Sequence, residues 1–419
     1  MNTLKSFSRL LMSKSQYNTS SSAHHHLHWL LGLECKGQYM MKFHKRTLAT
    51  YSKESVGHHH HGTSCSNVHR EESSEVEEEA PIIKLQKLQQ EQTSPKSKPT
   101  PIDNIANKVI YDTVDVSKIT KEEFDVTMSN LREQLRKINP EQYSLALLQK
   151  DVDSVNICTI LYCLNAEWAT IKDHTKSQTT GSLRLAWWKD QLKNTLVGHP
   201  PRVPALIALA YMQSQAKPEN KLKFSQFRNI FKWREIDLRW KQPATLADIE
   251  NYSDGVYGSL IMAHLQAVGK RDIHTDHVAS HIGRSYGICT LLRAVPHLIE
   301  QGSTYLPAQL CAKFGVTEDD IYSKHVSPAL EEVVFKVADL AHSHLDLARE
   351  LAALKDEKSQ KLLVDPKSYP LFMHSIICEV FLERLQKVNF NIFDDRLSAQ
   401  SMRFPILFRL GKTKWFGKY

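Results

Sequence analysis

The sequence predicts an all-α protein, in which a single large helical domain follows a disordered N-terminal region. Beyond Ile102, amphipathic patterns with apolar residues at three- and four-residue steps follow one another, with few strand-like alternations. Residues 51–101 are instead low in complexity, and such a segment buries too little apolar surface to offset its chain entropy. At 419 residues the chain is long enough for one large domain with appendages.

The first fifty residues have the composition of a mitochondrial presequence. Met1 to Leu33 contain no acidic residue, whereas Lys5, Arg9 and Lys14 lie among apolar residues that could form a basic amphipathic helix. We therefore expect a transit peptide at 1–50, a disordered linker at 51–101 and a mitochondrial location. A disordered basic tail without targeting function is the alternative.

Successive amphipathic patterns predict an all-α domain of about nine or ten helices at 102–402. The clearest pattern covers Pro328 to Leu354, where Ser327 can cap the start and Pro328 suits the first turn. Similar patterns predict helices at about 120–138, 141–150, 154–174, 181–196, 203–214, 246–268, 275–300 and 369–388. No apolar run approaches the roughly 18 residues that a membrane-spanning helix requires.

Four blocks of the predicted domain carry recognisable motifs. One runs from Ile282 to Leu310 and contains Arg293 followed by a turn with the sequence Tyr305-Leu306-Pro307. The others are LYCLNAEWATIKDH at 161–174, GSLRLAWWKDQL at 181–192 and ADIENYSDGVYGSLIMAHL at 247–265. Together the four blocks resemble the squalene/phytoene synthase superfamily. The resemblance implies an all-α fold of the isoprenoid (squalene/phytoene) synthase type.

Members of that superfamily carry two Asp-rich motifs that this chain has largely lost. Carboxylates at positions i, i+3 and i+4 share a helical face, and two such faces can hold Mg²⁺ ions against a prenyl diphosphate. The six matching positions are Ala169, Lys172, Asp173, Ala294, His297 and Leu298. One carboxylate beside an ammonium group should not recruit Mg²⁺. We therefore expect no catalytic residue and no cofactor, that is, a pseudoenzyme.

Some side chains of the motifs could still line a vestigial pocket. The candidates are Arg184, Tyr252, Tyr286 and Arg293. The two arginines could bind an anionic or lipid head group, but they could equally pair with a buried acid such as Asp173 or Asp190. The tyrosines could line the pocket or pack in the core.

Two groups of histidines raise the question of a metal site. The His58–His61 run is in the low-complexity segment, which offers no fixed geometry. His274, His277 and His281 have a spacing that could place ligands on one helical face. We interpret them as exposed polar residues at a helix start, and we expect no metal site.

The C-terminal tail at 403–419 mixes aromatic and basic residues and contains no acidic residue. This composition suits an anionic membrane interface. The tail could instead pack back on the helical body as an arm. The sequence leaves both interpretations open.

Within the superfamily, the degraded acids, the LRLAWWKDQL helix and the presequence-like start most resemble the branch of mitochondrial complex I assembly factors. That resemblance implies a non-catalytic protein that assists assembly of NADH:ubiquinone oxidoreductase, peripherally bound to the matrix side of the inner membrane. Its partners would be complex I subunits or other assembly factors, with a lipid or isoprenoid as a candidate ligand and no nucleic acid. The alternatives are an isoprenoid-diphosphate-binding protein, an active prenyltransferase, or a helical interaction domain without a ligand pocket.

Overall fold

The structure is a computed structural model that describes residues 113–175 and 177–416. The expected presequence at 1–50, the linker at 51–101 and the His58–His61 run lie outside the described residues. Within the described residues, helices are joined by loops, and the extended pairings are two isolated bridges. The predicted all-α fold class is therefore confirmed.

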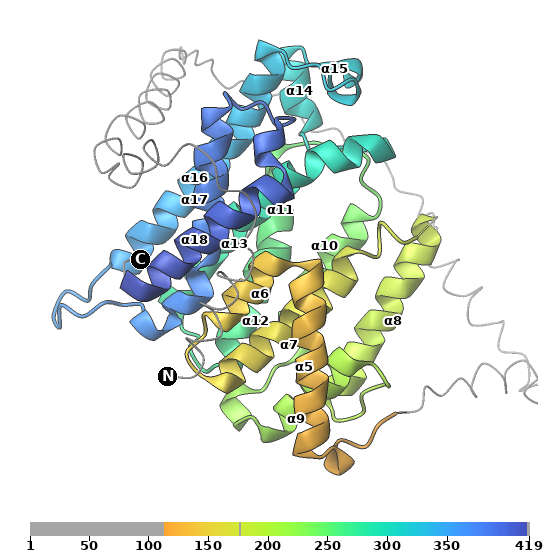
Figure 1. Ribbon diagram of the computed structural model, residues 1–419, viewed down its shortest axis with the longest axis vertical. Helices are drawn as coiled ribbons and strands as arrows, with labels where there is room; N and C mark the ends of the chain where they lie inside the picture. Colours follow the sequence, from red (N-terminus) through yellow and green to blue (C-terminus); the bar gives the residue numbers. More distant parts are fainter. Residues whose placement is uncertain (1–112, 176, 417–419) are drawn as a thin grey trace, which may run out of the picture. The chain divides into compact units, whose positions relative to one another are not determined.

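Fourteen α-helices form the described part of the chain (Figure 1). They are α5 (Lys121–Ile138), α6 (Pro140–Leu147), α7 (Val152–Ala169), α8 (Gln178–Leu196), α9 (Pro204–Gln215), α10 (Arg228–Asp237), α11 (Leu246–Ser253), α12 (Ser259–Ala267), α13 (Ile273–Leu298), α14 (Ala308–Phe314), α15 (Glu318–Tyr322), α16 (Pro328–Ala353), α17 (His374–Lys387) and α18 (Ala399–Phe416). Each amphipathic pattern read from the sequence corresponds to a helix, with ends shifted by a few residues. The pattern at 246–268 spans α11, a π-helical turn at Asp254–Gly258, and α12.

The ends of several helices follow directly from their local sequence. The Ser327 side chain accepts a hydrogen bond from the backbone N–H of Leu330 and caps α16 as predicted. In α5, Thr120 and Glu123 form a reciprocal capping box. After α13, Gly302 takes a left-handed conformation with φ of 72°, which ends the helix before the Tyr305-Leu306-Pro307 turn.

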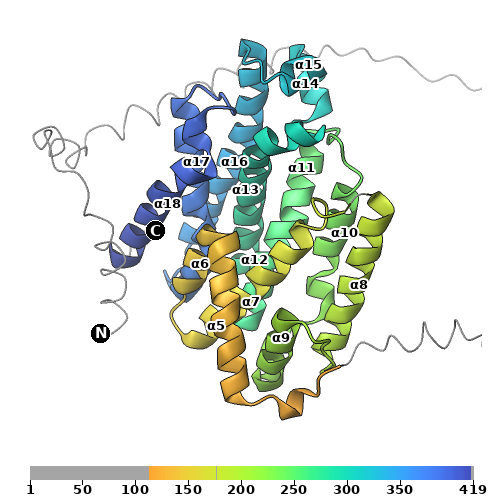
Figure 2. The same cartoon turned by 45° about the vertical axis from the view of Figure 1, so that its right-hand side comes forward.

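Helix α13 is the element around which this part of the chain is packed. It lies along α16 on one side and contacts α11, the π-helical turn, α12 and α17 on others (Figure 2). The contact with the π-helical turn is backbone to backbone, because a Cβ atom placed on Gly283 would lie 2.3 Å from the Cα atom of Gly258. Glycine at 283 is therefore required by space.

Helices α10, α14, α15 and α18 were not expected from the sequence. Helix α18 runs from Ala399 to Phe416, so it crosses the boundary drawn between the domain and the tail at 402/403. Its buried side chains are Met402, Ile406 and Leu410, and the helix contacts α17 and α6. Of the two interpretations of the tail, packing as a C-terminal arm describes this helix as far as Phe416.

Candidate functional site

Lys172, at the second carboxylate position of the first motif, forms a buried ion pair. It lies in the turn after α7, and its Nζ atom donates to Oδ1 of Asp237 at 2.9 Å and to the carbonyl oxygen of Trp240 at 3.3 Å. The Asp237 side chain, at the end of α10, is only 6% exposed. The ammonium group therefore compensates the charge of a buried carboxylate.

Tyr305, from the Tyr-Leu-Pro turn, completes this cluster. Its hydroxyl group donates to the same Oδ1 atom of Asp237 at 2.7 Å, and the Lys172 ammonium lies 5.2 Å from the centre of its ring. Burial, followed by the nearby Asp237 carboxylate, raises the pKa of Tyr305 well above its ordinary value. The hydroxyl thus stays protonated as a donor. We call Lys172, Asp237 and Tyr305 the Lys172 cluster.

A second cation, Arg234 on α10, lies deeper in the same region. Its guanidinium group donates to the hydroxyl oxygen of Tyr252 at 2.7 Å and to Oδ1 of Asn165 at 3.1 Å. Its Nε atom is buried without a hydrogen-bond partner in the described part of the chain. Burial tends to lower the pKa of Arg234, but Tyr252, Tyr257 and Asp237 together raise it above its ordinary value. The guanidinium group therefore remains charged.

At the second motif, Arg293 is also engaged in an ion pair. Its two terminal nitrogens bind the two carboxylate oxygens of Glu141 at 2.9 and 2.7 Å. The sequence suggested Asp173 or Asp190 as a buried partner, and this was wrong because Glu141 at the start of α6 is the acid that lies against α13. The bidentate geometry fixes α6 to α13.

The remaining motif positions differ in how far they are exposed to solvent. Asp173 and His297 are exposed, Ala169 and Ala294 are half-buried, and Leu298 is buried. The Nε2 atom of His297 is hydrogen-bonded to Gln301 at 2.9 Å. The single retained carboxylate is therefore at the surface.

Of the four pocket candidates, three lie in the interior and one does not. Tyr252, Tyr286 and Arg293 are largely buried, whereas Arg184 is exposed on α8. Arg184 therefore does not share a site with the other three. Tyr286 lies near the Arg293–Glu141 pair, and burial, followed by Glu141, raises its pKa above the ordinary value.

Aromatic rings in the interior form two groups of contacting rings. The first group runs from Tyr162 through His374 and Tyr286 to Tyr257, and the second is the pair of Tyr252 and Trp240. Ring centres in contact are 4.8 to 5.9 Å apart, and Arg234 bridges Tyr257 and Tyr252 at 6.0 and 5.8 Å. These tyrosines pack against one another as core residues do.

The residues at the motif positions do not fit the Mg²⁺ ions that the family would imply. Mg²⁺ prefers several carboxylate oxygens in octahedral geometry, whereas these positions present a paired ammonium, apolar groups and one exposed carboxylate. No three His, Cys, Asp or Glu side chains within residues 113–175 and 177–416 are grouped to hold a metal ion. His281 contacts His344 on α16, with their Nδ1 atoms 3.0 Å apart, while His274 and His277 are exposed.

Sequence reasoning missed Arg234, Asp237 and Glu141. In α10 the buried residues are Ile230, Phe231, Arg234 and Asp237. Their three- and four-residue spacing is that of a buried helical stripe, but two charged members make the stripe resemble a solvated face. Glu141 carried no local signal, because its partner Arg293 is 152 positions away.

Comparisons with known proteins agree with this fold. Residues 141–403 match the squalene/phytoene synthase family. The chain is 31% identical over 274 residues to NADH dehydrogenase (ubiquinone) complex I, assembly factor 6 of Mus musculus, which covers 65% of this chain and 78% of that protein. It is 23% identical to presqualene diphosphate synthase of Rhodopseudomonas palustris, covering 49% of this chain and 71% of that protein. A crystal structure of a dehydrosqualene synthase in complex with a ligand superposes with a TM-score of 0.58 at 18% identity, covering 71% of this chain and 99% of that one.

Proposed function

The chain belongs to the squalene/phytoene synthase family, and we propose that it assists assembly of mitochondrial respiratory complex I without catalysing prenyl transfer. The assembly role is supported by the similarity to proteins named as complex I assembly factor 6, which extends over 65% of the chain. Complex I subunits or other assembly factors would then be its partners.

The observation that supports a non-catalytic role is the ion pair of Lys172. Ionising a prenyl diphosphate with metal ions requires carboxylates that converge on a cavity. Here an ammonium group stands at a carboxylate position and is bound to Asp237 at 2.9 Å. A Mg²⁺ ion recruited to Asp237 would have to displace this ammonium and the Tyr305 hydroxyl group, leaving Lys172 without its partner. In this proposal the chain keeps the fold of the family, while Lys172 at a former carboxylate position stabilises the structure.

We further propose that residues 1–50 direct the chain to mitochondria, that 51–101 form a linker, and that the helical domain works on the matrix side of the inner membrane. None of the described helices is long and apolar enough to cross a membrane. We propose that its contact with the membrane is peripheral.

Helix α18 offers a surface for that contact. Opposite its buried residues it exposes Phe404 and Phe408, with 69% and 61% of each residue accessible, and the two rings stack with centres 6.1 Å apart. Arg403 and Lys412 are exposed on the same helix. Exposed aromatic rings beside basic groups suit the interface of an anionic membrane.

Gene disruption tests the assembly role. Cells without this protein should lack assembled complex I on a native gel, and the intact chain should restore it. A variant with Asp173→Asn should restore it equally well, because Asp173 is the only carboxylate left at the six positions and is exposed. Normal complex I in the disrupted cells would refute the assembly role, and a failure of the Asp173 variant alone would implicate a reaction.

Incubation of the purified chain with Mg²⁺ and labelled farnesyl or geranylgeranyl diphosphate tests the absence of catalysis. We expect no release of diphosphate. Release that disappears in the Asp173→Asn variant would overturn the non-catalytic proposal while leaving the assembly role open.

Targeting is tested with a fusion that carries residues 1–60 ahead of a fluorescent protein. The fusion should enter mitochondria, and a cytosolic distribution would contradict the proposed presequence.

A further inference from the structure

A pocket lies at the start of α7, at the opposite end of this helix from Lys172. An 18-residue helix is about 27 Å long, so the pocket is remote from the first of the two former motifs. Its cavity volume is about 170 Å³. Three segments form it, namely the turn between α6 and α7, the loop after α12 and the turn before α17. The lining residues are Gln149, Lys150, Asp151, Ser154, Val268, Lys270, Lys367, Pro370 and Leu371.

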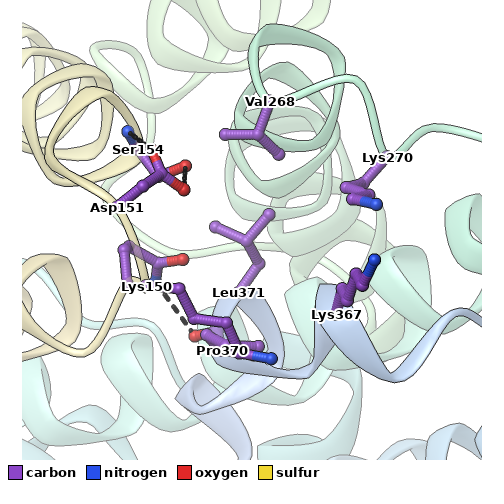
Figure 3. A pocket seen from close by; sticks show the side chains of 9 residues that line it. Lys150, Asp151, Ser154, Val268, Lys270, Lys367, Pro370 and Leu371 are labelled. Carbon is purple, nitrogen blue, oxygen red and sulfur yellow. Dashed lines mark hydrogen bonds between the residues drawn. The ribbon is translucent and has the colours of Figure 1, made fainter.

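The pocket has an apolar centre and a charged edge (Figure 3). Val268 and Leu371 project into the middle. On one side, the Asp151 carboxylate accepts hydrogen bonds from the backbone N–H and the hydroxyl of Ser154, both at 2.8 Å. On the other side, the ammonium groups of Lys270 and Lys367 are turned toward each other.

The charges around the pocket are unbalanced. Lysines at 150, 270 and 367 line it together with a single acid, Asp151. Lys270 is paired with Asp365 outside the lining at 2.9 Å, and Asp365 also lies within electrostatic reach of Lys367. Counting Asp365, three positive groups face two negative ones. Asp365 offsets part of the repulsion between Lys270 and Lys367, and the one positive charge that remains in excess favours an anion at this edge of the pocket.

Exposed apolar side chains flank the same pocket. Val152 follows Asp151 at the start of α7, and Ile273 begins α13 just beyond the Lys270 loop; they are 69% and 66% exposed. Val152 is therefore an exposed apolar side chain next in sequence to the lining residue Asp151.

We propose that this pocket binds the phosphate group of an anionic ligand, either the head group of a phospholipid or a soluble phosphate. Lys150, Lys270 and Lys367 would contact the phosphate oxygens, and Val268, Pro370 and Leu371 would contact the apolar part of a lipid. This site is separate from the positions at which the family binds diphosphate, and it does not depend on the proposed role in assembly.

The test compares two charge-matched variants of the full chain. Lys150→Glu with Lys367→Glu changes the pocket without breaking the Lys270–Asp365 pair. Lys121→Glu with Lys189→Glu makes the same change of charge at exposed positions on α5 and α8. Titration with inorganic phosphate should show binding that is weakened more than about tenfold in the pocket variant, because two charge-assisted contacts are lost. The control variant should bind as the unchanged chain does.

Vesicles distinguish the two sources of phosphate. Phosphatidylcholine vesicles with and without phosphatidic acid would be sedimented with each protein. Binding that requires phosphatidic acid and is weaker in the pocket variant than in the control identifies a lipid head group, and the proposed α18 contact would account for any binding that both variants keep. Binding of inorganic phosphate alone with the same dependence identifies a soluble ligand. If neither probe binds, or if both variants lose binding equally, the proposal is wrong.

Hydrogen exchange provides a readout that does not rely on variants. Phosphate should slow exchange of the amides at 149–154 and 367–371 in the unchanged chain, because these segments line the pocket. Unchanged exchange at phosphate concentrations that saturate the titration would place the binding elsewhere and overturn the assignment.

Discussion

Replacing Lys172 with Met should destabilise the helical domain, because the change leaves the buried Asp237 carboxylate without its ion-pair partner, and Arg234 acts on it only at longer range. In the structure that carboxylate receives the Lys172 ammonium at 2.9 Å and the Tyr305 hydroxyl at 2.7 Å. Its side chain is 6% exposed. Water therefore has little access to replace the lost ammonium group.

The size of the effect follows from these contacts. Removing one partner of a buried ion pair costs about 3–5 kcal/mol, and the hydroxyl bond that remains should keep the loss near the lower value, about 3 kcal/mol. The double variant Lys172→Met with Asp237→Asn removes the unpaired charge as well. We expect it to recover about half of the loss, so that the two single changes are strongly non-additive.

Urea unfolding of the full chain at neutral pH, followed by tryptophan fluorescence, measures these free energies. Lys189→Met serves as the control, because Lys189 is exposed on α8, and it should change stability by less than about 0.5 kcal/mol. The reasoning fails if Lys172→Met is as mild as the control. It fails equally if the effects of the Lys172 and Asp237 changes simply add.

Three further predictions concern other parts of the domain. Arg293→Met should lower the free energy of unfolding by about 3–5 kcal/mol, and adding Glu141→Leu should restore part of it; additive losses in urea unfolding would show that the pair is not coupled. Stability should fall as the pH drops from about 6.5 toward 4, because burial lowers the pKa of His374 to about 4, so the unfolded chain binds a proton there that the folded chain does not. The loss of folding free energy attributable to His374 is about 3 kcal/mol. In thermal melts, a His374→Gln variant should therefore show a melting temperature that depends less on pH. A pH dependence equal to that of the unchanged chain would show that other groups cause the loss of stability. Phe404→Ser with Phe408→Ser should weaken sedimentation with anionic vesicles without lowering the melting temperature by more than a few degrees, and full retention of vesicle binding would exclude α18 as the membrane contact.

The helices that could be predicted are those whose signal is local. Ser327 caps α16 through a hydrogen bond to a residue three positions away, and the apolar stripe of that helix repeats within its own sequence. Gly302 ends the α13 region by its own left-handed backbone. Each of these features is decided within one or two helical turns, so the sequence around it contains the required information.

The site was only partly predictable, because its contacts join distant segments. The motif comparison located Lys172 and Arg293, but their partners Asp237 and Glu141 are 65 and 152 positions away. Nothing in the local pattern distinguishes these acids from the many that are solvated. For Arg184 the motif comparison itself was misleading, because it suggested a position in the interior whereas the residue is exposed on α8.

Because Gly283 and Gly258 touch through their backbones, replacing Gly283 with alanine would require a large structural change although it adds only one methyl group. A methyl group at position 283 would fall 2.3 Å from a backbone atom, and a backbone atom cannot rotate aside as a flexible side chain can. Helix α13 would have to move away from the π-helical turn, and α16 and α17 pack on α13. In a mutational scan, alanine should therefore be rejected at this position even though Gly283 carries no charge and has no side chain to contact a ligand.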